Sequence, residues 1–266
     1  MIKFLSLIMS LSLLFSPIKV FANENKITNN EFSWYYSYDK NLNKLVAPKE
    51  TPYATEDLAI YKGDESQKVL YLTFDEGYEN GFTPKILEVL NNNNVPAAFF
   101  VTKPYITGNP DIIKSMVDGG HLVCNHTSRH KSMPTLANKP EFKDEFTNVE
   151  IAYKEVTGKD MPKYFRPPMG RYSHKALVET KNLGYISVFW SFAYKDWLVD
   201  KQPSREYAVN KITSNIHNGQ ILLLHACSKT NTEILDEVLK KLKNDGYEFK
   251  SLDHLMENRK TGEALN

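Results

Sequence analysis

The chain of 266 residues is predicted to fold as an α/β protein whose parallel sheet closes into a barrel-like shape. Apolar runs typical of strands recur after residue 68, and helix-like segments separate them. This alternation predicts a parallel sheet, and seven such units favour closure over an open sheet. The expected strands are 69–74, 97–101, 121–124, 164–166, 185–190, 221–225 and 247–250.

Proline and polar residues predict where the intervening helices begin. Thr83 with Pro84 is expected to cap one helix, Asn109 with Pro110 opens the next, and Pro140 opens a longer one.

The later helices have capping serines and terminal glycines. Ser173 and Ser204 are predicted caps, and Gly184 and Gly246 are predicted ends. Residues 231–245 form an amphipathic segment with one apolar stripe.

The chain is predicted to have three parts. Residues 1–22 read as a secretory signal, with Lys3 before a short apolar stretch and Ala22 at the cleavage site. An uncleaved anchor is the alternative, although the stretch is short for a span, and both place the body outside the cytoplasm. No other segment has the character of a membrane domain. Residues 23–65 are expected to form a mostly irregular N-terminal arm over the surface of the main domain, residues 66–266.

Charge and cysteine content exclude some classes of protein. The formal net charge is +1, which argues against a partner bound by bulk charge, such as nucleic acid. The chain has two cysteines, Cys124 and Cys227, too few for a disulfide scaffold. Buried thiols are favoured, and a single bridge stays open.

Unusual polar residues follow the predicted strands. In a parallel barrel the carboxyl ends of the strands meet on one face, so these residues are expected to converge there. They are Asp75 and Glu76 after the first strand, His126 and His130 after the third, Arg166 at the end of the fourth, Asp196 and Trp197 after the fifth, and His225 at the end of the sixth.

The pair His126 and His130 is spaced for metal binding. On one helical turn this spacing places both imidazoles on the same side, where they can bind one divalent ion. Two unrelated surface histidines are the alternative. A strand-end carboxylate favours the metal site, because two histidines and one carboxylate are a common catalytic ligand set.

Arg166 and His225 are expected to act with carboxylates. Two prolines fix the backbone after Arg166, whose guanidinium needs a carboxylate partner such as Asp75 or Asp196. A structural salt bridge is the other interpretation of Arg166. His225 opposite a base can protonate a leaving group, or it can simply be hydrogen-bonded in the core.

The motifs TFDEG, HTSRH, RPPMG, DW and LLH, in this order, resemble those of metal-dependent polysaccharide deacetylases with a NodB homology domain. The segments TFDEGYENG, TPKILEVL and FKSLDHLM are similar to the subgroup that forms muramic δ-lactam in the peptidoglycan of spore cortex. The resemblance implies a distorted (β/α)7-type barrel and one divalent metal ion, with zinc as the expected identity.

The resemblance also implies a role for each motif residue. Asp75 matches the general base, His225 the general acid, Arg166 the residue that orients the base, and Asp196 its support. His126 and His130 match metal ligands, with Glu76 as the third. Trp197 would line the acetyl pocket, and the Met169 N–H would stabilise the oxyanion.

Two positions differ from the pattern of the family. Glu76 stands where most members have a ligating Asp, and Met169 where an aromatic residue is common. From its position after Gly170 we expect Arg171 to contact the lactyl carboxylate of muramic acid, with an exposed structural Arg as the alternative.

The sequence therefore predicts a secreted hydrolase that removes acetyl groups from the muramic acid of a peptidoglycan glycan strand. It would act after an amidase has stripped the peptide, in the cell wall or outside, or between the forespore and mother-cell membranes if spore-specific. A deacetylase of chitin-like or exopolysaccharide chains, and a metal-free cell-wall binding protein, are the competing interpretations.

Overall fold

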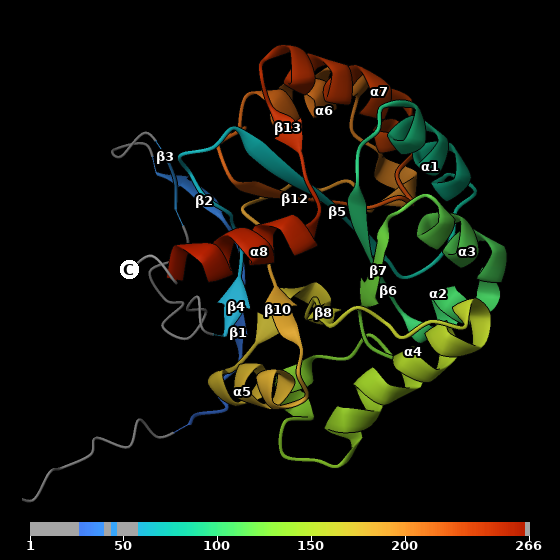
Figure 1. The fold of residues 1–266 in the computed structure, drawn as a ribbon, viewed down its shortest axis with the longest axis vertical. Coiled ribbons are helices and arrows are strands. Elements are labelled where there is room, and N and C mark those ends of the chain that lie inside the picture. The colour runs from blue at the N-terminus through green and yellow to red at the C-terminus, as the bar shows by residue number, and fades with distance from the viewer. Residues whose placement is uncertain (1–26, 40–43, 47–57, 264–266) are drawn as a thin grey trace, which may run out of the picture.

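The computed structural model describes residues 27–39, 44–46 and 58–263, which form an α/β fold around one curled sheet (Figure 1). The predicted signal, 1–22, and part of the predicted arm lie outside the described residues. The strands of the main sheet are β4 (Ala59–Ile60), β5 (Val69–Glu76), β6 (Ala97–Val101), β7 (Leu122–Asn125), β8 (Tyr164–Phe165), β10 (Ile186–Val188), β11 (Phe192–Ala193), β12 (Gln220–Leu224) and β13 (Glu248–Phe249).

The strands of this sheet pair in parallel in the order β11-β12-β5-β6-β7-β8-β10-β4, and β13 pairs with the amino end of β5. The segment from β10 to β11 joins the two ends of this order. Phe189 N–H donates to the Ile60 carbonyl after β4 (2.7 Å), and Ser191 N–H donates to Ile221 of β12 (3.1 Å). The predicted distorted barrel is therefore confirmed, with each predicted run containing one strand.

Helices surround the curled sheet on its outer side (Figure 1). Ser173 and Ser204 cap helices as predicted, accepting bonds from Ala176 N–H (3.0 Å) and Tyr207 N–H (3.2 Å). The α-helices are α1 (Thr83–Asn92), α2 (Lys103–Gly108), α3 (Pro110–Asp118), α4 (Glu141–Thr157), α5 (His174–Asn182), α6 (Arg205–Thr213), α7 (Lys229–Asn244) and α8 (Leu252–Glu263), and the 3-10 turns are η1 (Met133–Thr135), η2 (Pro168–Gly170) and η3 (Val199–Lys201).

The predicted cap at Thr83 is wrong by one position. Thr83 is the first residue of α1, and its N–H donates to the carboxylate of Glu79 (3.2 Å) in the preceding loop. Glu79, four residues before Thr83, therefore accepts the bond from the first helical N–H. In the usual pattern the capping side chain belongs to the residue directly before the helix.

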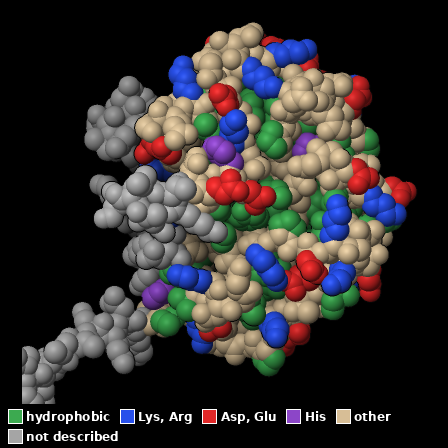
Figure 2. Space-filling model, viewed as in Figure 1, with side chains coloured by type: hydrophobic (Ala, Val, Ile, Leu, Met, Phe, Trp, Pro, Cys, Tyr) green, Lys and Arg blue, Asp and Glu red, His purple; other side chains and the backbone are tan. Residues whose placement is uncertain are grey.

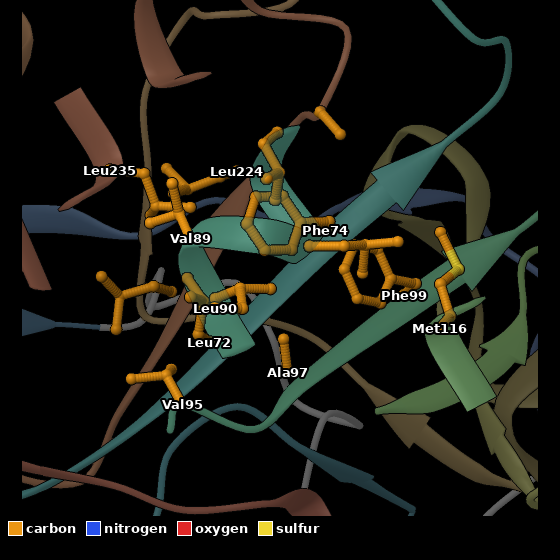
Figure 3. Close-up of a cluster of buried hydrophobic side chains, with 14 of the residues drawn as sticks. Leu72, Phe74, Val89, Leu90, Val95, Ala97, Phe99, Met116, Leu224 and Leu235 are labelled. Carbon is orange, nitrogen blue, oxygen red and sulfur yellow. The ribbon is translucent and has the colours of Figure 1, made fainter. Parts of the chain in front are cut away.

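Two hydrophobic clusters hold the barrel together. The larger lies between sheet and helices, where Phe74 of β5 stacks on Phe99 of β6 with ring centroids 5.1 Å apart (Figure 3). The second fills the barrel interior. Leu252 and Leu255 of α8 pack in it against Tyr71, so α8 closes the end from which the strands start (Figure 1).

The described part of the N-terminal arm is more ordered than expected. β1 (Phe32–Ser33) pairs with β9 (Arg171–Tyr172), and β2 (Ser37–Asp39) pairs with β3 (Lys44–Val46). β4 also belongs to the predicted arm, yet it is an edge strand of the main sheet. Most of the described arm residues nevertheless lie outside these short strands, as expected for a mostly irregular arm. Strands of two or three residues are too short to leave a periodic pattern.

The structure also bears on three predictions made from composition: the surface charge, the absence of a membrane-spanning helix after the signal segment, and the state of the cysteine thiols. On the face in Figure 2 acidic and basic side chains are interspersed, in line with the net charge of +1. Among residues 27–39, 44–46 and 58–263, no helix is long and apolar enough to cross a membrane. Cys124 and Cys227 are both free and buried, which confirms the favoured interpretation.

Candidate active site

A cavity of about 910 Å³ lies at the carboxyl ends of the strands, where the sequence predicted convergence. Arg166 and Asp196 are fully buried just behind this cavity, whereas Glu76 and Arg171 do not line it. The predicted site residues that line the cavity are Asp75, His126, His130, Met169, Trp197 and His225.

Asp75 is held by the buried guanidinium of Arg166. Nη1 of Arg166 donates to Asp75 Oδ1 (2.8 Å), while its Nε and Nη2 donate to the carbonyls of Val188 (3.0 Å) and Phe189 (3.3 Å). Burial by itself would raise the pKa of Asp75, but the charge and hydrogen bond of Arg166, together with the nearby His126 and His225, outweigh it, and the pKa is lowered. Asp75 is thus an ionised carboxylate whose second oxygen faces the cavity.

His126 presents one ring nitrogen to this carboxylate. Its Nδ1–H donates to the Arg166 carbonyl (2.8 Å), which leaves the lone pair on Nε2, 3.7 Å from Asp75 Oδ2. Burial lowers the pKa of His126 to about 4 and also lowers that of His130. The two rings lie 5.0 Å apart between centroids. Two neutral imidazoles therefore lie side by side next to a carboxylate.

The loop that carries both histidines is not the helical turn that their spacing suggested. Thr127 and His130 have positive φ of 73° and 53°, so the chain turns sharply between them. Asn125 Oδ1 accepts from Thr127 N–H (2.9 Å), and Thr127 Oγ1 accepts from His130 N–H (2.9 Å). A buried hydrogen-bonded turn, and not helix periodicity, brings the rings together.

Glu145 of α4 holds the same loop through hydrogen bonds to Arg129. This fully buried carboxylate accepts from Arg129 N–H (2.8 Å) and from Arg129 Nε (2.6 Å). Sequence reasoning missed Glu145, because nothing distinguishes it from the other acids of a polar helix. Its charge is matched by Arg129, the residue immediately before His130.

The fit of a divalent ion rests on the two histidines. Neutral imidazole is a good ligand for such ions, and the fixed tautomer of His126 aims its lone pair at the cavity. In the part of the chain that the structure describes, no three His, Cys, Asp or Glu side chains are arranged so that they could hold a metal ion together. His126 and His130 fit as ligands, and the third ligand predicted from sequence is not beside them.

Glu76 is that third residue, and its position is a correction. Neighbouring strand residues point to opposite faces, so Glu76 points away from the face that Asp75 occupies. Its side chain is 1% exposed, and its Oε1 has no hydrogen-bond partner among the described residues. Burial, and then the charges of Glu79 and Asp75, raise its pKa well above the usual value. Glu76 is therefore best described as a neutral buried acid.

Asp196 organises His225 on the opposite side of the cavity. Its Oδ1 accepts from Nδ1 of His225 (2.7 Å), and its Oδ2 accepts from His225 N–H (2.9 Å) and Asn231 Nδ2 (2.6 Å). Of the two carboxylates expected near Arg166, Asp75 is the partner and Asp196 is not. Asn231, which lies in the first turn of α7, was not among the residues predicted from sequence.

The Asp196 carboxylate keeps His225 protonated to higher pH. Burial alone would lower the pKa of His225, yet the charge and hydrogen bond of Asp196, with the charge of Asp75, outweigh it and raise the pKa. With Nδ1–H bound to Asp196, the Nε2 proton of the imidazolium is the one available for transfer. His225 thus has the properties of a general acid.

Asp196→Asn is expected to move the alkaline limb of the pH profile of kcat/KM to lower pH. The neutral amide no longer stabilises the imidazolium, so His225 loses its proton at a lower pH, and less of the acid form remains near neutrality. The profile of Asp200→Asn, which removes an exposed acid of the same loop, should be unchanged. An unmoved alkaline limb in Asp196→Asn would show that another group sets it.

Met169 and Trp197 both lie on the cavity wall. Met169 has a φ of 59°, in a turn whose flanking residue Gly170 is also left-handed at 64°. The Trp197 ring lies 5.4 Å from that of His225 and is 44% exposed. Both side chains are therefore presented to a ligand, although their individual roles stay predictions.

Arg171 is the second correction. After the left-handed residues Met169 and Gly170, the chain enters β9, and Nη1 of Arg171 pairs with Glu31 of the arm (3.0 Å). The position after a glycine predicted a residue on the active face, but the turn directs Arg171 to the surface beside β1. Its predicted contact with a substrate carboxylate has no support from this location.

The arrangement supports proton transfer on both sides of one cavity. An ionised base, Asp75, and a histidine whose pKa is raised, His225, both line it, and each is held by a buried side chain that carries the complementary charge. Two neutral histidines lie beside the base. Such a set suits attack of water on an amide or ester carbonyl, followed by protonation of the leaving group.

Comparison with known proteins assigns the family. Residues 62–188 match the model of the polysaccharide deacetylase family. The peptidoglycan-N-acetylmuramic acid deacetylase PdaA of Bacillus subtilis is 39% identical over 236 residues, which are 88% of this chain and 89% of PdaA. A chitooligosaccharide deacetylase of Bradyrhizobium is 34% identical over 164 residues, 61% of this chain and 73% of that protein.

Comparison with solved structures supports the same family. The structure of Bacillus subtilis PdaA, a family 4 carbohydrate esterase, matches with a TM-score of 0.82 at 39% identity. The match covers 88% of this chain and 100% of the PdaA chain. The structure of a family 4 carbohydrate esterase from Bacillus anthracis matches with a TM-score of 0.72 at 40% identity. The match covers 87% of this chain and 98% of the esterase chain. Together with the acid, base and histidines of the cavity, these likenesses show that the chain belongs to the polysaccharide deacetylase family, hydrolases that act on amide bonds.

Proposed function

We propose that this protein removes the acetyl group from N-acetylmuramic acid in peptidoglycan. The observation that carries the proposal is the likeness to PdaA over nearly the full length of both chains. The cavity supports the chemistry, because base and acid line the same space.

In the proposed mechanism Asp75 takes a proton from the attacking water. Its pKa is lowered, so it is ionised at neutral pH, and Arg166 fixes its direction. The Met169 N–H is the proposed donor to the oxyanion. His225 then gives its Nε2 proton to the amine as acetate leaves.

The members of this family typically depend on a metal, and His126 and His130 are the residues that would hold it. When bound, a divalent ion supplies electrophilic polarisation of the amide carbonyl and of the water. Zinc suits imidazole ligands and stays the expected identity.

The biological context is also part of the proposal. The freed amine of muramic acid lies on the same sugar as the lactyl carboxyl group, with which it can close a δ-lactam of spore cortex. The carboxyl group must be free of its peptide for this, so an amidase would act first. The signal-like segment 1–22 supports export to the wall, or to the space between forespore and mother cell.

A chitin-like substrate is the second candidate, favoured by the likeness to a chitooligosaccharide deacetylase. Acetate release from peptide-free muramic glycan and from chitin hexamer, each with a series of divalent ions, separates the two. Release from the muramic glycan at a higher kcat/KM supports the proposal. Activity confined to the chitin hexamer would contradict it, and a metal-free binding protein would release acetate from neither.

Lys195 is the residue that we expect to distinguish muramic acid from glucosamine. Muramic acid differs by its lactyl carboxylate, which a cation in the cavity can bind. Arg129 lines the cavity but is paired with Glu145, whereas Lys195 lines it without an ion-pair partner among the described residues. The ammonium group of Lys195 is therefore available to bind the carboxylate of the substrate.

Lys195→Ala is expected to lower the ratio of kcat/KM for muramic glycan to that for chitin hexamer about fivefold, corresponding to ~1 kcal/mol for an exposed charge pair. Arg171→Ala is the matched control, because it removes a cation that lies outside the cavity. An unchanged ratio in Lys195→Ala would remove this residue from the argument.

A further inference from the structure

The exposed aromatic side chains of the described residues gather in the active-site cavity. Those exposed by more than a third are Tyr35 (53%), Tyr78 (51%), Trp197 (44%) and Tyr207 (54%). Three of these four line the cavity, and Tyr207 lies on α6. Single exposed aromatics are common on protein surfaces, but three in one hollow indicate a binding surface.

Tyr35 differs from the other two because it comes from the N-terminal arm. Its neighbour Trp34 is 3% exposed and is anchored to the wall of the cavity. Trp34 N–H donates to the Gly170 carbonyl (2.8 Å), its Nε1–H donates to the Trp190 carbonyl (2.9 Å), and its ring stacks on Phe189 at 4.7 Å. The backbone of Tyr35 is therefore fixed at the cavity.

The Tyr35 ring itself has no stacking or hydrogen-bond partner in the described part of the chain. An aromatic face that is held in place and left open at a cavity loses favourable burial, unless a ligand covers it. The backbone beside Tyr35 is anchored to the Met169–Gly170 turn through Trp34, whereas Trp197 lies beside the acid His225. The two aromatic side chains thus belong to different parts of the cavity wall.

The chemistry of a glycan fits such a wall. A pyranose ring has an apolar C–H face that packs on an aromatic ring, and its hydroxyl groups stay hydrated at the rim. The cavity of about 910 Å³ lies at the upper end of the usual range for ligand sites, roughly 300–1,000 Å³. A polymer that places one sugar between Asp75 and His225 must run along the walls with its neighbouring sugars.

We propose that Tyr35 forms a platform for a sugar next to the one that is deacetylated, so that the arm supplies a subsite for longer glycans. This inference rests on the proposed function, since it takes the ligand to be an N-acetylated glycan. It adds that the arm, which precedes the catalytic barrel strands, selects for polymer length.

The test is calorimetric binding to the Asp75→Asn protein, which keeps the cavity and is expected to turn over its ligand only slowly. The probes are peptide-free glycans of two and of six sugars. Tyr35→Ala in this background is expected to weaken binding of the six-sugar probe about three- to tenfold and to leave the two-sugar probe unchanged. Tyr35→Phe should retain the binding, because the ring face is kept.

Tyr207→Ala is the matched control, as it removes an equally exposed tyrosine outside the cavity. Thermal unfolding midpoints of the variants should agree, which excludes loss of the arm as the cause. Equal loss on both probes, or no loss on the six-sugar probe, would overturn the subsite. If the parent protein binds neither glycan, the proposed function fails, and the subsite fails with it. If the unmodified enzyme releases acetate, but Tyr35→Ala weakens binding of the six-sugar probe no more than that of the two-sugar probe, only the subsite is refuted.

Discussion

Asp75→Asn is expected to lower kcat for deacetylation by on the order of 10²–10⁴, the usual contribution of a positioned proton-transfer group. The amide keeps the shape of the side chain and can still accept a bond from Arg166, but it cannot take a proton from water. The loss should appear in kcat, with KM little changed, because the substrate is held by the cavity and not by this oxygen. Steady-state kinetics on peptide-free glycan give both quantities.

Two measurements make this result specific to proton transfer. Metal content of Asp75→Asn should match that of the unmodified protein, since His126 and His130 are intact, and it should fall in the His126→Ala, His130→Ala double variant. The circular dichroism spectrum should also be unchanged. A correctly folded, metal-replete Asp75→Asn protein with near-normal kcat would refute the mechanism.

Arg166→Met is expected to lower the free energy of unfolding by about 3–5 kcal/mol, because it leaves the carboxylate of Asp75 buried without its charge partner. Arg166 is fully buried and also donates to the carbonyls of Val188 and Phe189, which methionine leaves unpaired. The exposed pair of Lys154 with Asp160 is the comparison, and Lys154→Met should change stability by no more than ~0.5 kcal/mol. Denaturant unfolding measures both variants.

Arg166→Lys separates charge from geometry. Lysine keeps the positive charge but cannot donate to Asp75, Val188 and Phe189 together, so the base is no longer aimed. Activity should fall roughly 10- to 100-fold, as expected when one group of a catalytic set is displaced, while metal is still bound. Full activity in Arg166→Lys would make Arg166 only a structural salt bridge. If Arg166→Met is as stable as the unmodified protein, the pair with Asp75 contributes no more than a surface contact.

The barrel could be predicted from sequence because its strands are buried on both faces and appear as continuous apolar runs. The capping roles of Ser173 and Ser204 could also be predicted, because their hydroxyl groups accept hydrogen bonds from the first turn of the helix that follows directly in sequence. β4 and β11 were not, because each has two residues and is specified by pairing with strands far away in the chain. The same holds for β1, whose pairing with β9 depends on the turn at Gly170.

For the site, sequence reasoning found the base, the acid and the histidine pair that line the cavity, because charged groups at strand ends stand out. Beyond Arg166 and Asp196, it did not find the residues that support this set. Glu145 and Asn231 look like ordinary helix residues, and only the packed structure shows that one holds the histidine loop and the other Asp196. Glu76 and Arg171 were misplaced, because adjacency in sequence was taken for adjacency in space. Strand alternation directs one away from the cavity, and a left-handed turn directs the other to the surface.

The central claim is that this chain removes acetyl groups from muramic acid. The most direct test is mass spectrometry of peptide-free peptidoglycan glycan after incubation with the protein and a divalent ion, with fragmentation to locate each free amine. The account predicts free amines on muramic acid residues, and far fewer after the same incubation with the Asp75→Asn protein. Free amines on glucosamine alone, or an equal yield from the Asp75→Asn protein, would contradict it.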